Sequence, residues 1–277
     1  MNNQIQKKMD GLQILIDNVQ SSKKFATICV DTIKRIGEKE LRKNADVKTA
    51  IKATKRKLHQ VFGCYANRQE LHYDAIYEKL KVAYDTQSET EIKEACRRVL
   101  MLHTSTRERI TILEKFYEFI FNVTGQPKSI IDVACGLNPL TLPWMDLGKT
   151  AQYFAYDIDE NTIDFINKYL KLTGLKSMAL AQDVIVQPPM VEADVALLLK
   201  TIPCLEQQEK GCSIRLIEAL RAKQIVVSFP VKSIGGKSKG MAENYERILY
   251  NLIRGRDCQV TKLPFETELV FVIYKLH

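Results

Sequence analysis

The sequence lacks the features that mark secreted, metal-binding and membrane-spanning proteins. Its seven cysteines are scattered and never spaced as C-x-x-C, which argues against a disulfide framework or a structural zinc site and predicts a reducing, cytoplasmic setting. The histidines show no ligand-like spacing, so we expect no metal centre. No apolar run approaches the thickness of a bilayer and the N-terminus has no signal-peptide pattern, so we expect no membrane association.

Positive charge is confined to one part of the chain. The net charge is +8, but residues 1–106 hold 20 Lys/Arg against 13 Asp/Glu, whereas residues 107–277 hold 21 against 20. Residues 23–57 alone carry 12 basic and 4 acidic side chains. Such a patch attracts a polyanion, either nucleic acid or an anionic membrane, although a helix face kept soluble by lysines has the same composition. The residues of this patch that we expect to contact nucleic acid are Lys23, Lys24, Lys48, Lys52, Lys55 and Arg56.

Periodic apolar residues predict that the first part of the chain is helical. Ala50, Ile51, Thr54 and Leu58 recur at three- and four-residue steps and form one stripe of a helix, while the lysines from Lys48 onward recur on another side. Further helices are expected over residues 5–20, 32–42, 69–84, 91–102 and 107–121. Since no strand alternation interrupts this pattern, residues 1–106 are predicted to form a basic, all-helical domain that binds RNA.

From residue 128 onward, short apolar runs alternate with helical stretches. Strands are expected over residues 129–134, 153–156, 178–181, 195–199 and 225–229, with helices over 161–172, 206–222 and 241–254. This alternation predicts a parallel, doubly wound sheet. Two closing strands over 258–263 and 269–274 fit a methyltransferase better than a dinucleotide dehydrogenase. Residues 107–277 are therefore predicted to form an α/β, Rossmann-like methyltransferase domain.

Glycine is scarce where a dinucleotide-binding loop would need it. The turn after the first strand, residues 132–139, contains only Gly136 and fails as G-x-G-x-x-G. One glycine still lets the backbone approach the methionine part of a cofactor that carries no pyrophosphate. The alternative is an ordinary strand-to-helix turn.

Acidic residues follow the second and third strands. Asp157 is placed to accept the hydroxyl groups of a ribose, unless it caps the helix that follows. Asp183 is placed to accept an adenine amino group, with Val184 against the ring. Because ligands of open α/β sheets bind at the carboxyl ends of the strands, these positions together predict a site for a nucleoside-containing cofactor.

Basic residues follow the fourth and fifth strands. Lys200 is expected at the mouth of the site, unless it is a lysine that extends to solvent from a strand end. The loop over residues 228–240 contains Lys232, Lys237 and Lys239 and is expected to meet the substrate. A solvated loop with no role in binding has the same composition.

Several motifs resemble those of the aminoglycoside-resistance 16S rRNA (guanine(1405)-N(7))-methyltransferases. The runs over residues 103–109 and 239–245 are specific to that family. Further matching segments extend over most of the chain, at residues 22–25, 58–59, 132–139, 156–159, 200–203, 228–230 and 268–270. The resemblance implies that the cofactor is S-adenosylmethionine and that the target is N7 of guanine 1405 within the 30S subunit. Methylation there blocks aminoglycosides such as gentamicin and kanamycin.

The same resemblance implies further site residues. Arg109 is expected to pair with the methionine carboxylate, for which a bidentate guanidinium is suited. The other residues expected to line the cofactor pocket are His103, Thr104, Ser105, Ala134, Leu199 and Gln208.

Guanine N7 carries a lone pair and no proton, so we expect no protein general base and a catalysis by positioning. The target base is expected to leave its stack and to be held by Tyr65, Phe229 or Tyr245, with Lys200 and Lys232 near its oxygen or phosphate.

We expect a monomer. One alternative is a methyltransferase acting on another rRNA or tRNA position, on a small molecule or on a ribose 2′-hydroxyl. The other is an RNA-binding protein without catalytic activity.

Overall fold

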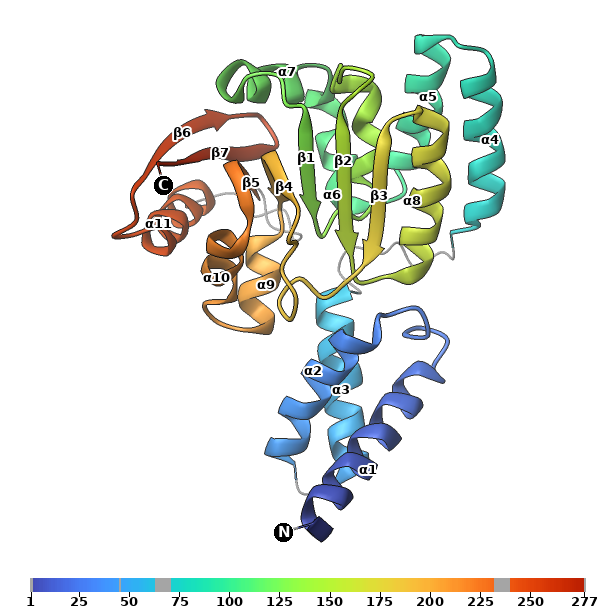
Figure 1. Ribbon diagram of the computed structural model, residues 1–277, viewed down its shortest axis with the longest axis vertical. Helices are drawn as coiled ribbons and strands as arrows, with labels where there is room; N and C mark the ends of the chain where they lie inside the picture. The colour runs from blue at the N-terminus through green and yellow to red at the C-terminus, as the bar shows by residue number, and fades with distance from the viewer. Residues whose placement is uncertain (1, 45, 63–70, 232–239, 277) are drawn as a thin grey trace.

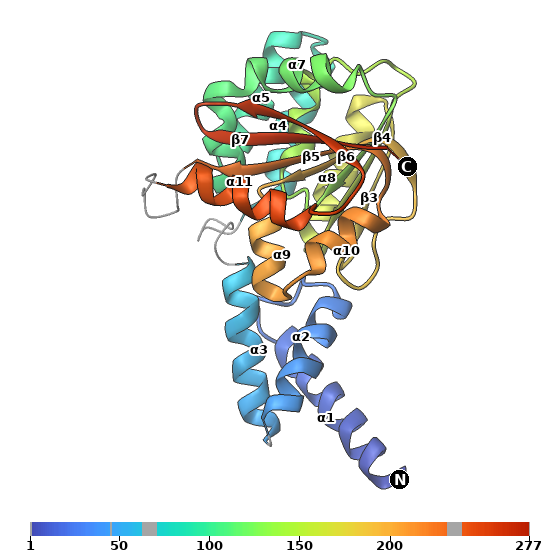
Figure 2. The ribbon, with the colours of Figure 1, turned by 90° about the vertical axis from the view of Figure 1, so that its left-hand side faces the viewer.

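The computed structural model describes residues 2–44, 46–62, 71–231 and 240–276. It consists of a seven-stranded sheet covered by helices on both faces and of a separate bundle of three helices (Figures 1 and 2). Among the helices within the described ranges, none is long and apolar enough to span a membrane.

The bundle is formed by α1 (Asn2–Gln20), α2 (Val30–Lys43) and α3 (Val47–Phe62). Its core contains Leu15, Ile33 and Leu58, each fully buried. Helices α1 and α2 approach closely at Gly37, where a Cβ atom would lie 2.6 Å from the Leu15 side chain. The predicted apolar stripe of α3 is confirmed, since its residues from Ala50 to Leu58 at three- and four-residue steps face this core.

The sheet has the strand order β3-β2-β1-β4-β5-β7-β6, in which β7 runs in the direction opposite to that of the other six strands. This confirms the predicted Rossmann-like sheet with a closing strand pair. The strands are β1 (Ser129–Val133), β2 (Gln152–Asp157), β3 (Lys176–Ala181), β4 (Glu192–Leu199), β5 (Arg221–Pro230), β6 (Cys258–Pro264) and β7 (Glu268–Lys275). The carboxyl ends of β1, β2 and β3 point toward the bundle (Figure 1). Strands β2 and β3 lie on one side of β1, and β4 and β5 lie on the other, so the strand order reverses at β1. Open α/β sheets bind ligands at such a reversal.

Two layers of helices cover the sheet. One face packs against α4 (Tyr73–Asp85), α5 (Glu89–Leu100), α7 (Leu113–Thr124), the 3₁₀ helix η2 (Asn138–Trp144) and α8 (Glu160–Thr173). The other packs against α9 (Ile202–Gln208), α10 (Cys212–Ala219) and α11 (Met241–Leu252). The short α6 (Thr104–Arg109) and the 3₁₀ turn η1 (Ile110–Ile112) lead into α7.

Two predicted helices are wrong in extent. The helix expected over residues 206–222 is two helices, α9 and α10, because Gly211 between them adopts φ = +75°, in the left-handed region that glycine favours. Its last two residues belong to β5 instead. The helix expected over 107–121 is divided by the turn η1.

Packing divides the molecule earlier than the boundary expected at residue 106. Leu80 on α4 and Cys96 and Leu100 on α5 belong to the same buried cluster as Tyr169 of α8 and Val195 of β4. Helices α4 and α5 therefore form part of the layer that covers the sheet. Their amphipathic pattern predicts a buried face but not which partner buries it, and this is why the sequence assigns them to the bundle.

We expect Leu100→Ala to destabilise the sheet domain by about 2–5 kcal/mol, the cost of emptying a fully buried leucine site. Denaturant unfolding followed by the fluorescence of Trp144, the single tryptophan, measures this loss. Val82→Ala on α4 serves as the control, since Val82 is 65% exposed and should change stability little. Equal effects of the two substitutions would show that α5 does not support the sheet.

Candidate active site

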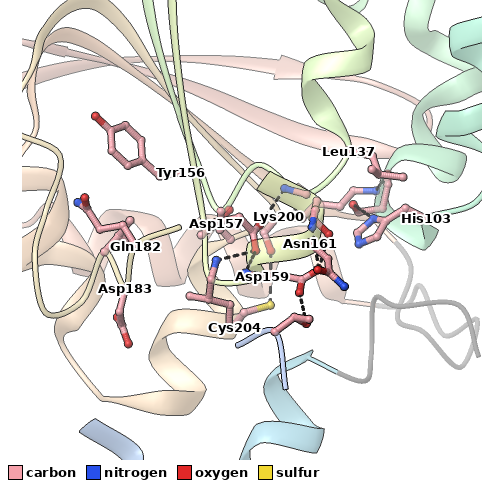
Figure 3. A pocket seen from close by; sticks show the side chains of 18 of the residues that line it. His103, Leu137, Tyr156, Asp157, Asp159, Asn161, Gln182, Asp183, Lys200 and Cys204 are labelled. Carbon is pink, nitrogen blue, oxygen red and sulfur yellow. Dashed lines mark hydrogen bonds between the residues drawn. The ribbon is translucent and has the colours of Figure 1, made fainter. Parts of the chain in front are cut away.

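A cavity of about 980 Å³ lies at the carboxyl ends of the strands, and residues of both the sheet domain and the bundle line it. Figure 3 shows side chains that line it, with His103 at one side of the view and Gln182 and Asp183 at the other. The structure brings together most of the residues that the sequence predicts for the cofactor. These lining residues are His103, Ser105, Ala134, Gly136, Asp157, Asp183, Val184, Leu199 and Gln208. Lys200, predicted to position the substrate, and Lys23 and Lys24 of the basic patch line the same cavity.

Asp157, the last residue of β2, ties the strand to the turn after β1. One carboxylate oxygen accepts the Gly136 N–H at 2.9 Å, and the other accepts the backbone N–H groups of Ile158 and Asp159. The helix cap is instead Asp159, which accepts the Thr162 N–H at the start of α8. Burial raises the pKa of Asp157. The alternative that Asp157 is only an N-cap is therefore wrong, and this carboxylate faces the cavity while it shapes the turn.

Two non-glycine residues at strand ends adopt the left-handed conformation. Ala134 follows β1 with φ = +53° and Lys200 follows β4 with φ = +59°. This conformation costs an L-residue roughly 1–2 kcal/mol, and such backbone strain is concentrated at functional sites. Both residues line the cavity, so the strained backbone marks the same place as the strand-end side chains.

Asp183 and Gln208 form the cavity wall that faces the bundle. Asp183 is 2% exposed; one oxygen accepts the Ile185 N–H and the other accepts Thr32 Oγ1 and Arg35 Nε, each at 2.8 Å. Gln208 accepts a hydrogen bond from the Arg35 guanidinium at 2.7 Å. Helix α2 of the bundle therefore contacts the cavity directly.

His103 lies at the opposite wall, where its Nδ1 is 2.9 Å from Ser105 Oγ. Burial, followed by the charges of Lys200 and Arg109, lowers the pKa of His103 to about 4. The imidazole is therefore neutral at physiological pH, so it adds no charge to the cavity.

A buried ion-pair network lies behind this wall. Arg109 donates from Nε and Nη2 to the two oxygens of Glu268 at 2.8 and 3.0 Å, and from Nη1 to Asn138 at 2.7 Å. Lys200 Nζ lies 2.7 Å from Glu108, 3.1 Å from the Ser105 carbonyl oxygen and 3.3 Å from Glu268. Burial opposes the ionisation of Glu268, but the charges of Arg109 and Lys200 outweigh it and lower the pKa of this carboxyl. The network joins α6, β4 and β7 into one wall.

Some predicted site residues lie elsewhere. Thr104, Arg109, Phe229 and Tyr245 are not among the residues that line the cavity. Arg109 has its guanidinium occupied by Glu268 and Asn138, so its contact with a methionine carboxylate stays a prediction. Phe229 is fully buried with Tyr245 stacked on it, their centroids 4.8 Å apart, so in this structure its ring is covered and is not available to a base. Tyr65, Lys232, Lys237 and Lys239 lie outside the described residues.

The sequence alone does not single out Thr27, Thr32 and Arg35, the bundle residues whose side chains bond to residues at the strand ends. Thr27, Thr32 and Arg35 contact Asp159 and Asp183 at the ends of strands that are more than 100 residues away in the chain. The spacing of Thr32 and Arg35, one helical turn apart, is the only signal for a shared target. In the sequence, nothing distinguishes Arg35 from the other basic residues of the patch.

We expect Glu268→Gln to destabilise the protein by about 3–5 kcal/mol at pH 7, because it leaves the buried charges of Arg109 and Lys200 without their counterion. Glu268 has a lowered folded-state pKa, so its stabilising contribution exists above the ordinary glutamate pKa of about 4.3 and is lost as the pH falls through the lowered value. Denaturant unfolding at a series of pH values from 7 down to about 3 should therefore show a difference from wild type that shrinks only below the ordinary glutamate pKa.

Glu218→Gln is the matched control, since Glu218 pairs with Arg256 at the surface, where the two side chains are 53% and 39% exposed. This substitution should change the stability little. A Glu268→Gln difference that is independent of pH would argue that the carboxylate charge does not hold the network.

Comparisons with known proteins agree with this geometry. The chain matches the family described as "Ribosomal RNA methyltransferase (FmrO)" over residues 21–272. It is 37% identical over 258 residues to a 16S rRNA (guanine(1405)-N(7))-methyltransferase of Micromonospora echinospora, covering 93% of this chain and 94% of the relative. A protein of Proteus mirabilis with the same name is 33% identical over 93% of this chain and 95% of its own length.

Solved structures are also similar over nearly the whole chain. The 16S rRNA methyltransferase RmtF, solved with S-adenosyl-L-homocysteine, gives a TM-score of 0.80 at 28% identity and covers 95% of this chain and 98% of its own. The 16S rRNA methylase RmtB gives a TM-score of 0.77 at 26% identity with the same coverage. The resemblance seen in the motifs is thus confirmed, and the chain belongs to the ribosomal RNA methyltransferase (FmrO) family.

Proposed function

We propose that this protein transfers a methyl group from S-adenosylmethionine to N7 of guanine 1405 of 16S rRNA and thereby confers aminoglycoside resistance. The observation that carries this proposal is the match over 93% of the chain to relatives named for that reaction. The cavity at the strand ends agrees with it, because it combines acceptors for a nucleoside with a basic bundle for RNA.

The cavity residues fit S-adenosylmethionine. Asp157 offers a carboxylate for the ribose hydroxyls and Asp183 one for the adenine amino group, while Val184 and Leu199 provide apolar contact for the ring. Gly136, with φ = +49°, and Ala134 let the backbone of the first turn approach the methionine part. When bound, the cofactor would supply a methyl group that the positive charge of its sulfur activates for transfer.

The protein residues act by orienting the reactants. N7 of guanine has no proton to remove, so the neutral His103 is not needed as a base. Lys200 is held by Glu108, Glu268 and the Ser105 carbonyl, and we propose that it positions the cavity wall for the substrate. Of the aromatic candidates within the described residues, Phe229 is buried and Tyr245, which stacks on it, is partly exposed, so Tyr245 is the one that we propose to stack on a flipped base.

The bundle is the proposed rRNA-binding surface. Lys23, Lys24, Lys48, Lys52 and Arg56 are exposed, and Lys55 bonds Asn18 at 2.9 Å while remaining partly exposed. We propose that this surface recognises the assembled 30S subunit by the shape of its folded RNA rather than by base edges.

We further propose that one chain is sufficient and that it works in the cytoplasm, where its rRNA substrate is. In support, both walls of the cavity come from a single chain: Arg35 and Lys24 from the bundle, and the strand ends from the sheet.

The direct test of the function is to incubate purified 30S subunits with the protein and labelled S-adenosylmethionine and to locate the modified nucleotide. We expect one N7-methylguanosine at position 1405. Label at another nucleotide or on a ribose would support the alternative enzymes, and cofactor binding without transfer would support a non-catalytic RNA-binding protein.

The single-turnover rate with saturating 30S subunits and cofactor should be nearly flat from about pH 6 to 9. No proton has to be removed from N7, and the His103 pKa of about 4 lies below this window, so the imidazole does not titrate within it. A tenfold rise per pH unit would reveal an essential deprotonation. As a second measurement, His103→Ala should change the rate at saturating cofactor by less than about tenfold, whereas loss of a general base typically costs more.

Replacing Lys48, Lys52 and Lys55 together by glutamine should make binding to 30S subunits less sensitive to salt. Each lost phosphate contact lowers the slope of log affinity against log salt by about 1. Cofactor affinity should not change. The matched control is the triple replacement of Lys79, Lys81 and Lys115, exposed residues on α4 and α7 at the far end of the molecule from the bundle. If both triple variants keep the wild-type slope, the patch is only a solvated helix face.

A further inference from the structure

Arg35 connects the rRNA-binding bundle to two residues of the cofactor cavity. Its guanidinium lies 2.8 Å from Asp183 and donates to Gln208 at 2.7 Å. The Arg35 side chain is 10% exposed and that of Asp183 is 2% exposed, so the pair is shielded from water and the charge-assisted contact is strong. Thr32, one turn earlier on α2, donates to the same Asp183 oxygen.

These contacts fix the orientation of both cavity residues. Asp183 is held on one oxygen by α2 and on the other by the Ile185 N–H, which leaves the carboxylate no freedom to rotate. Gln208 offers its amide oxygen to Arg35, so its amide nitrogen, a donor, is turned to the other side. Arg35 therefore determines what the end of β3 and the end of α9 present to a ligand.

Other contacts already attach the bundle to the sheet domain. The Cys29 N–H donates to the Ile158 carbonyl at 2.8 Å, Thr27 donates to Asp159 at 2.5 Å, and Lys39 pairs with Glu209. Arg35 differs from these because its Nη1 is buried without an acceptor among the described residues. A buried donor without a partner is unfavourable, so the position of this guanidinium is not the one that best satisfies its own hydrogen bonds. The charge-assisted contacts with Asp183 and Gln208 compensate for this cost.

We propose that Arg35 is a positioning residue for S-adenosylmethionine: through it, helix α2 of the bundle holds Asp183 and Gln208 in the orientation that receives the adenine end of the cofactor. The bundle is then part of the cofactor site as well as the rRNA-binding surface. This inference rests on the proposed cofactor roles of Asp183 and Gln208.

The test is the affinity of the full chain for S-adenosylhomocysteine, measured by calorimetry. Arg35→Lys keeps a positive charge beside Asp183, but a single ammonium on a flexible stem does not reproduce the fork that serves Asp183 and Gln208 together. We expect this variant to bind the ligand about tenfold more weakly. Arg42→Lys on the same helix is the matched control, because Arg42 is 75% exposed and pairs only with Glu38 in the described contacts; its affinity should stay within twofold of wild type.

Kinetics with 30S subunits separate positioning from general stability. Arg35→Lys should raise KM for S-adenosylmethionine about tenfold while kcat at saturating cofactor stays within about threefold. A residue that only docked the bundle would lower the thermal unfolding midpoint and leave KM unchanged. In a double-mutant cycle, the losses caused by Arg35→Lys and Gln208→Ala should sum to less than full additivity, because the two residues share one contact while the contact of Arg35 with Asp183 remains; full additivity would contradict the proposal.

The remaining variants distinguish failure of this inference from failure of the proposed cofactor site. If Asp183→Ala weakens ligand binding but Arg35→Lys does not, the positioning role of Arg35 is wrong and the cofactor site stands. If neither Asp183→Ala nor Gln208→Ala changes the affinity of a folded protein, the proposed site and this inference both fall. Should Arg35→Lys not fold, Thr32→Val decides, since it removes one donor to Asp183 without changing charge: a loss of several-fold supports the inference, and unchanged affinity overturns it.

Discussion

Arg109 and Glu268 lie 159 residues apart in the sequence and meet in the interior, where their side chains are at most 2% exposed. Buried charges of this kind are tolerated only when they are paired and hydrogen-bonded, and here each oxygen of the carboxylate receives a donor from the same guanidinium. The pair fixes the start of β7 against α6. Lys200 and Ser228 join the same carboxylate, so the ends of β4 and β5 are held as well. Much of the site depends on this one interaction, because four elements take their positions from it.

One consequence is the shape of the cavity wall on the His103 side. Helix α6 carries Ser105 and Glu108, which hold Lys200, and His103 immediately precedes it. The left-handed backbone of Lys200 is unfavourable by itself, and the contacts of its ammonium group compensate for that cost. A lysine that the sequence places at the mouth of the site is thus turned inward, where it supports the wall.

The opposite wall is built differently, mainly from polar contacts between the bundle and the sheet domain. The sheet domain has two buried clusters and the bundle has one. The two units meet through Thr27, Arg35 and Lys39, and Ile158 of the sheet domain packs against the bundle cluster. Polar contacts between prepacked units are specific in geometry and give little hydrophobic stabilisation. A site assembled in this way suits a reaction that needs no proton transfer, because the rate of methyl transfer to a lone pair depends on how well the two reactants are aligned.

The sequence alone determined the class of sheet, the helical first part of the chain with its basic patch, and the strand ends at or just after which Gly136, Asp157 and Asp183 lie. These follow from local periodicity and from the rule that ligands bind at the carboxyl ends of parallel strands. Its motifs also identified the family, which the comparisons confirmed. The positions at which helices are interrupted were harder to predict from the sequence. The division at Gly211 depends on one residue in a long amphipathic pattern.

Tertiary structure decided which surfaces meet. The sequence pattern of an amphipathic helix shows which face is buried but does not identify the element that buries it. Helices α4 and α5 could therefore be placed with the sheet only from their packing against α8 and η2. The same applies to charged residues: nothing local distinguishes Arg35, which pairs with Asp183, from the exposed lysines around it, or shows that Arg109 pairs with Glu268. Pairing between residues more than 100 positions apart is set by the fold as a whole, because only the assembled core brings such side chains within hydrogen-bonding distance.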